Sequence, residues 1–573
     1  MRTRTSFLDR FLATIETKKP SDTLLLRLLF FVTVASGLFF LITLNTNLTT
    51  KTPGRGGTLM EGIVGIPRFV NPALAITRAD QDTVGLIYSG LMKIDEKGDL
   101  IPDLAQSITL SEDKRTYTII LKKDKTFHDT TPLTTHDVVF TINLIRDPDL
   151  KSPLRGNWSD VTVEATGEYE MQITLLEPYT PFIENFTFGV MPQHIWSHLR
   201  IEQLPFSQYN TEPIGSGPFM ITAVNRDTTG LISGYELTPA TGDNTPNLDS
   251  IELKFFQNEE RLKEALLTRE INSTVFLPNE YLSELNPDKY QIRTMPLPRV
   301  FSIFFNQNRS PALRDKAARA ALSAAIDRES LVRDVLYGQG VPTTLPIVKE
   351  HHGVSLSDTV LEQTASFSSK SAEVILVEGG WKKNNSGGWE KKIDQVTETL
   401  DFTIRAENSK MSVATLNAIA ENWRRIGIAV QIEQYEQNGL VQSVIRSRDF
   451  EALLFGQDMN RLQDLYPFWH SSQKDDPGLN IAQYTNVTVD GLLEEARSVE
   501  DPSEQLRLLK ETSEIIEDEI PAIFLYAPSV TYVIDKEITS APMVRLGRPS
   551  DRFMNITNWH ARTDVVWPLF EQK

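Results

Sequence analysis

One long apolar segment close to the N-terminus limits what this chain can be. Residues 28–44 form an uncharged run of 17 residues, which would span about 26 Å as an α-helix at a rise of about 1.5 Å per residue. Adding the three leucines at 24–26 extends the segment to 21 residues and about 31 Å, which matches the hydrocarbon core of a bilayer. The single charge within it, Arg27, lies near one end and can reach the headgroups. Because no later stretch approaches this length, we expect one membrane helix followed by a soluble body.

The residues around this segment predict its orientation. Several basic residues precede it and mostly Asn and Thr follow it, so the positive-inside rule places a leader, 1–23, in the cytoplasm and the body outside. The alternative is a cleaved signal peptide, whose apolar region is about 7–15 residues long and ends at a small-x-small site. The run here is longer, and 44–47 contains no such site. We favour an uncleaved anchor at 24–44, followed by a tether at 45–53 that the Pro and Gly residues of 51–57 indicate to be flexible.

Composition excludes several classes of protein. Hydrophobic residues make up 40% of the chain and charged residues 23%, which is typical of a folded, soluble domain. The net charge of −18 argues against a nucleic-acid-binding protein, because such a protein needs a basic surface to displace phosphate counterions. The chain has no cysteine, which excludes disulfides, thiolate zinc sites, iron–sulfur clusters and a lipid-modified N-terminal cysteine. The length of 573 residues predicts about three to five compact units.

Local patterns predict a mixed α/β body. The segment 134–145 has helical character, with Thr134 able to cap it and Asp137 placed to complete a capping box. Residues 310–338 carry apolar side chains at helical spacing and predict one long helix. A last long helix is predicted over 504–519, because a proline follows it closely. Strands alternate with these helices without a fixed repeat.

The chain carries no convincing catalytic signature. Neither a P-loop, nor His-Glu-x-x-His, nor Gly-x-Ser-x-Gly occurs in it. The best metal candidate is His194, His198 and Glu202, which would share one face of a helix. A solvated or capping role suits these residues better, because such spacing arises often by chance. We therefore expect no enzyme, no cofactor and no metal site.

Several short sequence blocks, each of which occurs once, follow one another along the body in a characteristic order. They are 56–59, 69–72, 126–129, 132–138, 177–182, 191–194, 214–219, 304–308, 319–328, 338–342, 426–428, 468–471 and 519–524. In this order they resemble the family 5 solute-binding proteins, which are extracytoplasmic receptors of peptide and nickel ABC importers. Two departures stand out: Thr130 replaces a usual glycine, and 455–467 differs from the family's short Asp-x-x-x-Pro segment.

This resemblance implies an α/β, two-lobed periplasmic-binding-protein-like fold of type II with an extra subdomain, behind one N-terminal transmembrane helix. Lobe one would be discontinuous, comprising 54–95, 214–297 and 525–573. The inserted subdomain would be 96–213, and lobe two 298–524. Closure of the two lobes around a ligand excludes water and strengthens the polar contacts inside.

The resemblance also implies a function. The chain would be a membrane-anchored substrate-binding receptor, with its body periplasmic or extracellular, that captures oligopeptides and delivers them to an ABC permease and its separate ATPase subunits. An extended peptide can be held through its backbone, which gives affinity with broad sequence tolerance. Binding of a nickel chelate or an oligosaccharide, and a sensory role without transport, remain as alternatives.

The resemblance suggests where a ligand would bind. Peptide binders of the family carry, in the segment that corresponds to 455–467, an aspartate that pairs with the α-ammonium group of the ligand. Asp458 is the first candidate for this role because it follows an apolar strand, and Asp464 is the rival; either could instead cap a turn. Trp469 would form a pocket wall or a core aromatic residue. Further candidate contacts lie at expected lobe edges: Asn306, Asn308, Phe69, Asn71 and Arg405, the last of which could meet a ligand carboxylate.

Overall fold

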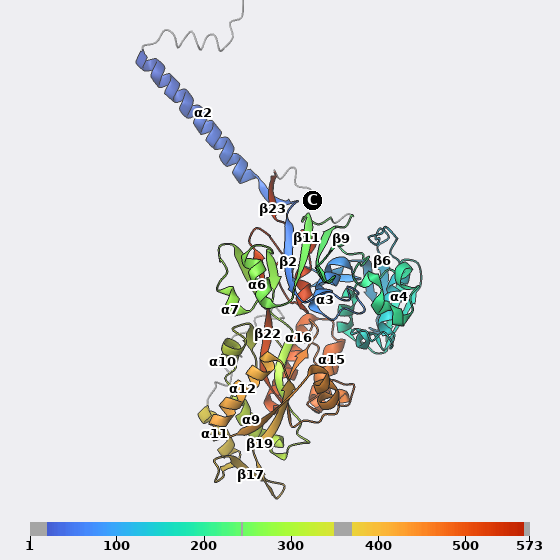
Figure 1. The fold of residues 1–573 in the computed structure, drawn as a ribbon, viewed down its shortest axis with the longest axis vertical. Helices are drawn as coiled ribbons and strands as arrows, with labels where there is room; N and C mark the ends of the chain where they lie inside the picture. The colour runs from blue at the N-terminus through green and yellow to red at the C-terminus, as the bar shows by residue number, and fades with distance from the viewer. Residues whose placement is uncertain (1–19, 242–244, 349–368, 567–573) are drawn as a thin grey trace, which may run out of the picture.

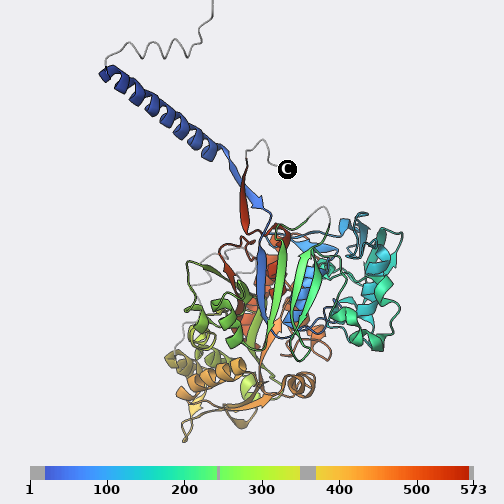
Figure 2. The same cartoon turned by 45° about the horizontal axis from the view of Figure 1, so that its top comes forward.

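The computed structural model describes residues 20–241, 245–348 and 369–566. Figure 1 shows a body with an upper part, a lower part and a region at the side of the upper part, while helix α2 (Pro20–Leu48) projects away from all three. The turned view in Figure 2 shows the same separation of α2 from the body. The described residues therefore form a projecting helix and a folded body.

Helix α2 covers the predicted anchor, 24–44, and continues to Leu48. Its apolar side chains are strongly exposed, for example Leu28 at 62% and Phe31 at 70%. Where side chains are described, no helical stretch of the chain reaches the length and apolarity that crossing a membrane requires. Most of the predicted leader, 1–19, lies outside the described residues.

The prediction of a flexible tether at 45–53 needs correction. Strand β1 (Thr50–Gly54) pairs in antiparallel fashion with β23 (Arg562–Val566), with Thr52 opposite Asp564. The Pro and Gly residues indicated a linker because their local preferences disfavour regular structure. The partner strand lies some five hundred residues away in the sequence, so no local pattern could reveal this ribbon. It connects α2 to the body beside the C-terminal end (Figure 1).

A twelve-stranded sheet runs through the upper and lower parts of the body. In spatial order its main path is β20 (Ala429–Tyr435), β19 (Asp401–Glu407), β21 (Ala452–Asp458), β14 (Arg299–Phe305), β22 (Ala522–Asp535), β12 (Ser273–Val275), β2 (Thr58–Val64), β11 (Ser250–Phe256), β10 (Ile232–Pro239) and β9 (Phe219–Arg226). Two further strands pair with β22, namely β13 (Tyr290–Pro296) and β15 (Gly340–Pro342).

Strand β22 belongs to both parts of the body. Its first residues, Ala522 to Tyr526, pair with β14, and its last residues, Ser529 to Asp535, pair with β13. Successive side chains of a strand point to opposite faces, and the beginning of β22 accordingly sends Ile523 into one core cluster and Phe524 into another. The end of the strand contributes to the separate core of the upper part. A second crossing lies between Pro296 and Arg299, where β13 leads into β14.

The region at the side of the upper part contains a four-stranded antiparallel sheet and helix α4 (Thr135–Arg146). The predicted capping box is confirmed: the backbone N–H of Thr134 donates to Asp137 Oδ2 at 2.9 Å. The strands of this sheet are β5 (Ala105–Leu110), β6 (Thr116–Leu121), β8 (Glu170–Leu175) and β7 (Val161–Ala165), and β3 (Met92–Ile94) pairs with β4 (Leu100–Pro102) nearby.

The prediction of one long helix over 310–338 is wrong. Asp315 ends the first turn and accepts a hydrogen bond from the N–H of Ala318, which starts a new helix. Asp327 caps a third segment in the same way through Ser330. Aspartate favours N-caps over helix interiors because its carboxylate binds free backbone N–H groups. The result is α8 (Pro311–Arg314), α9 (Lys316–Ala324), α10 (Arg328–Ser330) and the turn η5 (Leu331–Val335).

The predicted helix at 504–519 is confirmed as α16 (Pro502–Glu519), which Asp501 caps. The other helices are α3 (Arg78–Ile87), α5 (Gln193–Trp196), α6 (Glu259–Leu267), α7 (Asn279–Leu282), α11 (Ser369–Glu378), α12 (Lys410–Arg425), α13 (Gln437–Gly439), α14 (Tyr466–Trp469) and α15 (Val487–Ser498). A small sheet of β16 (Lys382–Lys383), β17 (Trp389–Ile393) and β18 (Val396–Thr399) completes the lower part.

Three fully buried charges join distant segments of the upper part. Arg552, in the 3-10 turn η10 (Pro549–Phe553), donates to Glu61 of β2 at 2.8 Å and to Asp82 of α3 at 2.7 Å. All three side chains have no exposed surface. Burial raises the pKa of Glu61 above its usual value, although Arg552 opposes this shift. Each charge is tolerated in the interior only because the others are present.

This cluster generates a prediction about stability. Replacing Arg552 by Met should reduce the free energy of unfolding by about 3–5 kcal/mol, because two buried carboxylates lose their cation. The matched control is Arg507→Met, since Arg507 forms exposed ion pairs on α16, and its loss should cost less than about 1 kcal/mol. Urea unfolding followed by fluorescence gives both values. Equal losses in the two variants would contradict the importance of the buried cluster.

Candidate functional site

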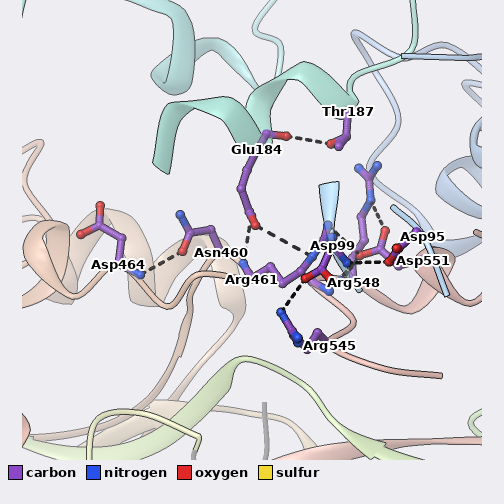
Figure 3. A network of polar contacts seen from close by, with 11 residues as sticks. Asp95, Asp99, Glu184, Thr187, Asn460, Arg461, Asp464, Arg545, Arg548 and Asp551 are labelled. Atoms are coloured by element: carbon purple, nitrogen blue, oxygen red, sulfur yellow. Dashed lines mark hydrogen bonds and ion pairs between the residues drawn. The ribbon is translucent and has the colours of Figure 1, made fainter. Parts of the chain in front are cut away.

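A cleft of about 820 Å³ lies where the side region, the lower part and the C-terminal segment meet. Its walls come from three ranges that are far apart in the sequence, 154–188, 458–497 and 547–551. A concave space of this size, lined by apolar and charged side chains, is typical of a ligand-binding site. Figure 3 shows part of its polar lining.

The loop that follows β21 forms one wall of the cleft. Its buried residue Gln463 exchanges hydrogen bonds with the backbone of Val348, at 2.6 and 2.9 Å. Asn460 accepts a hydrogen bond from the N–H of Asp464 at 2.9 Å (Figure 3). Polar side chains thus replace the missing backbone pairing of the loop, and they hold it in one shape at the end of the strand.

Asp464, a predicted ligand contact, lies buried in a bridge between the loop and the side region. Its carboxylate accepts hydrogen bonds from Arg497 at 2.6 Å and from the Tyr179 hydroxyl at 3.0 Å. The Arg497 guanidinium also stacks on the Tyr466 ring at 3.8 Å. Burial, with the charge of Asp464 as the next cause, raises the pKa of Tyr179 well above its usual value, so this residue is a neutral donor. Asp464 is therefore already engaged with protein partners.

Asp458, the first candidate for the ammonium partner, lies at the end of β21 and lines the same cleft. Its side chain is 64% exposed and forms a two-pronged ion pair with Arg299 of β14. Of the two candidate aspartates, Asp458 is the one that a ligand can reach from solvent. Neither its role nor that of Asp464 is tested by this geometry, so both stay predictions.

The other candidates from the lower part of the body do not belong to the cleft lining. Trp469 has no exposed surface and packs in the core against Phe304 and Phe524. Asn306 is buried and donates to the backbone carbonyl of Arg448 at 2.8 Å. The remaining two make polar contacts outside the cleft: Asn308 donates to Gln483 at 3.1 Å, and Arg405 pairs with Glu433 at 2.8 Å and with Asp449 at 3.0 Å.

The two candidates from the opening loop shape the backbone. The N–H of Phe69 donates to Asp80 at 2.7 Å. Asn71 is buried and accepts a hydrogen bond from the N–H of Ala73 at 2.9 Å, while its amide donates to Asn210 at 3.2 Å. Both residues belong to the structure around the start of α3, and neither lines this cleft.

Three charged residues that the sequence analysis did not single out meet in the lining of the cleft (Figure 3). Glu184, in the 3-10 helix η2 (Thr180–Thr187), accepts a hydrogen bond from the backbone N–H of Arg461 at 3.1 Å. The Arg461 side chain lies 3.9 Å from Glu184 and 3.8 Å from Asp551 of η10. No local motif marks these residues, and the only available signal was the departure of 455–467 from the family pattern.

The electrostatics of this group are unusual at neutral pH. Burial raises the pKa of Glu184 to about 7, and Arg461 only partly opposes the shift. Asp551 is held by the N–H of Gly547 at 2.8 Å and by the Arg548 side chain at 3.1 Å. The cleft therefore contains one carboxyl group that can lose or gain a proton under physiological conditions.

The metal candidate of the sequence analysis does not form a cluster. His194 pairs with Asp129 at 2.7 Å. Within the described ranges, no group of three or more His, Asp or Glu residues is arranged to hold a metal ion.

Comparisons with known proteins identify chains of similar sequence and fold. The chain is 28% identical over 485 residues to the oligopeptide-binding protein AppA of Bacillus subtilis, which covers 83% of this chain and 87% of that protein. The solved structure of AppA in complex with a nonapeptide matches with a TM-score of 0.67 and 26% identity, over 89% of this chain and 99% of that chain. NikZ of Campylobacter jejuni, solved in complex with Ni(L-His), matches with a TM-score of 0.66 over 88% and 99%; at 24% identity this likeness concerns the fold alone.

These matches confirm the two-lobed, periplasmic-binding-protein-like α/β fold that the sequence blocks implied. The profile of the bacterial extracellular solute-binding proteins, family 5, matches residues 99–477, which is most of the body. The resemblance noted in the sequence is thereby confirmed, and the chain belongs to family 5 of the bacterial extracellular solute-binding proteins.

Proposed function

We propose that this chain is the extracytoplasmic receptor of an ABC importer, and that it captures oligopeptides between its two lobes. The observation that carries this proposal is the cleft of about 820 Å³, because its walls come from both lobes and include several hydrogen-bonding groups. The similarity to AppA, an oligopeptide-binding protein that was solved with a nonapeptide, supports peptides as the ligand class.

The lobes are assigned as in the sequence analysis. Lobe one comprises 54–95, 214–297 and 525–573, lobe two comprises 298–524, and 96–213 is inserted in lobe one. Separate hydrophobic cores on the two sides of the crossing strands support this division. Few backbone connections join the lobes, so small changes at the crossings can open and close the cleft as a hinge.

The projecting helix is proposed to anchor the receptor in the membrane through 24–44. Its exposed leucine and phenylalanine side chains support this role, since an apolar helix without a packing partner needs lipid or another protein around it. Delivery of the ligand to a membrane permease with separate ATPase subunits follows as the proposed purpose of this attachment.

The ligand class is tested by mass spectrometry of small molecules released on denaturing the purified protein. We expect a series of short peptides, because closure of the cleft should retain part of the captured ligand during purification. The length distribution would also show how much of the cleft a ligand fills. A metal chelate or a sugar as the main released species would contradict the assignment to peptides.

Asp458 is proposed to pair with the α-ammonium group of the peptide. Asp458→Asn should weaken binding of a peptide with a free N-terminus about five- to tenfold, since the lost charge pair becomes shielded from water on closure. N-acetylated peptides of the same sequence should bind both proteins equally. Asp518→Asn is the matched control, because Asp518 is an exposed carboxylate paired with Lys316 outside the cleft. Calorimetric titration measures the affinities of the three proteins for the free and the acetylated peptide. A loss that is the same for free and acetylated peptides would contradict the proposed pairing.

The anchor is tested by determining the N-terminus of protein extracted from membranes. We expect a chain that begins upstream of residue 24, because 44–47 offers no cleavage site. An N-terminus downstream of residue 44 would show that the segment is removed.

A further inference from the structure

One arginine in the cleft lacks the hydrogen-bond partners that a buried cation needs. The Arg461 side chain is only 7% exposed, and within the described part of the chain its Nε and Nη1 atoms are buried without a hydrogen-bond partner. Its Nη2 atom lies 3.8 Å from Asp551 Oδ2, which is beyond hydrogen-bonding distance. Arg461 nevertheless belongs to the lining of the cleft.

The neighbouring arginines differ from Arg461 in this respect. Arg497 donates three hydrogen bonds to Asp464, at 2.6, 3.1 and 3.3 Å, and Arg548 donates to Asp551 at 3.1 Å. At the rim, Arg299 forms a two-pronged pair with Asp458. Each of these guanidinium groups already donates a hydrogen bond to a carboxylate.

The local charges leave room for one more anion. Glu184 is the nearest carboxyl group to Arg461 besides Asp551, and a proton occupies it for much of the time at neutral pH because burial raises its pKa to about 7. Asp551 shares its charge between Arg461 and Arg548. With Glu184 protonated, two guanidinium groups therefore face a single negative charge.

We propose that Arg461 binds a carboxylate of the captured ligand, so that the receptor selects peptides with a free C-terminus or an acidic side chain there. This inference rests on the proposed peptide-binding function. The planar guanidinium fork matches the two oxygens of a carboxylate. A buried cation without hydrogen bonds is costly, and such a ligand group supplies the missing acceptors. A small parting of the cleft walls gives the ligand access to the fork.

Binding of a ligand carboxylate at Arg461 should be coupled to proton binding at Glu184. A ligand carboxylate at Arg461 adds a negative charge beside Glu184 and competes with it for the same cation. The groups that face Glu184 are Arg461 from the loop after β21, Asp551 and Arg548 from η10 and its start, and the neutral Tyr179 that precedes η2. The ligand should therefore raise the pKa of Glu184 further, which makes binding tighter below pH 7 than above it.

The test compares two peptide pools that differ only at the C-terminus. Random hexapeptides without Asp or Glu are prepared as free acids and as carboxamides, and calorimetric titration of the full-length protein gives their affinities. We expect the wild-type protein to bind the acids at least tenfold more tightly. Arg461→Gln should lose this preference, and Arg461→Lys should keep only part of it because it lacks the planar fork.

The control variant is Arg545→Gln. Arg545 pairs with Asp99 at 3.0 Å within the same polar network but does not line the cleft. The Arg545→Gln variant also loses one positive charge. It should keep the preference for free-acid peptides if Arg461 is the residue that binds the carboxylate. Equal melting temperatures of the variants exclude a general loss of structure.

The outcomes separate this inference from the function on which it rests. Equal binding of both pools to the wild-type protein would overturn the role of Arg461 and leave the peptide receptor intact. A preference for free acids that survives Arg461→Gln would also overturn the role of Arg461, because another group would then bind the carboxylate. Binding of neither pool would overturn the receptor function together with this inference.

The pH dependence provides a readout that a purely structural role would not alter. For this measurement the peptides of both pools are N-acetylated and free of His, because an α-ammonium group titrates at about pH 8 and a His side chain at about pH 6.5, and each would add a pH dependence of its own. Affinity for the free-acid pool should then fall several-fold between pH 6 and pH 8 in the wild-type protein. The Glu184→Gln variant should show a flat profile, because no proton competes there, and the carboxamide pool should be flat with both proteins. A fall that persists in Glu184→Gln would contradict the coupling.

Discussion

The buried ion cluster of Arg552, Glu61 and Asp82 is the constraint on which the cleft depends. Arg552 lies in the short turn η10, which has few backbone hydrogen bonds of its own, and its side chain reaches inward to β2 and α3. The preceding residue, Asp551, points toward the cleft and Arg461. One adjacent pair of residues therefore ties the C-terminal segment to the interior of the upper part and presents a carboxylate to the cleft.

The contacts across the cleft are polar, whereas each lobe has an apolar core of its own. Tyr179, from the region at the side, donates to Asp464 of the lower part, and Glu184 accepts from the backbone of Arg461. Water can replace such contacts at modest cost when the lobes separate. Apolar contacts of the same area would resist opening more strongly. This division between apolar cores and a polar boundary suits a receptor that must both enclose and release its ligand.

The sequence was informative where the governing interactions are local. The capping box at Thr134 and the helix at 504–519 were predicted because the residues that stabilise them lie within a few positions. The helix predicted over 310–338 was wrong because apolar spacing continues through Asp315, whose carboxylate instead caps a new helix. The region 455–467 was singled out because the family resemblance implies a ligand contact there, and that contact stays a prediction; the partners of its charges could not be predicted.

By itself, the sequence determined the family, the mixed α/β class and the apolar N-terminal segment, since these can be recognised from ordered sequence blocks, local residue patterns and one continuous apolar run. Only the tertiary structure decided that the supposed tether pairs with the C-terminal strand, that Asp464 is engaged by Arg497, and that Arg461 lies between Glu184 and Asp551. The physical reason is that hydrogen bonds and ion pairs act over a few ångströms in space. Their partners here are separated by tens to hundreds of residues along the chain, and only folding brings them together.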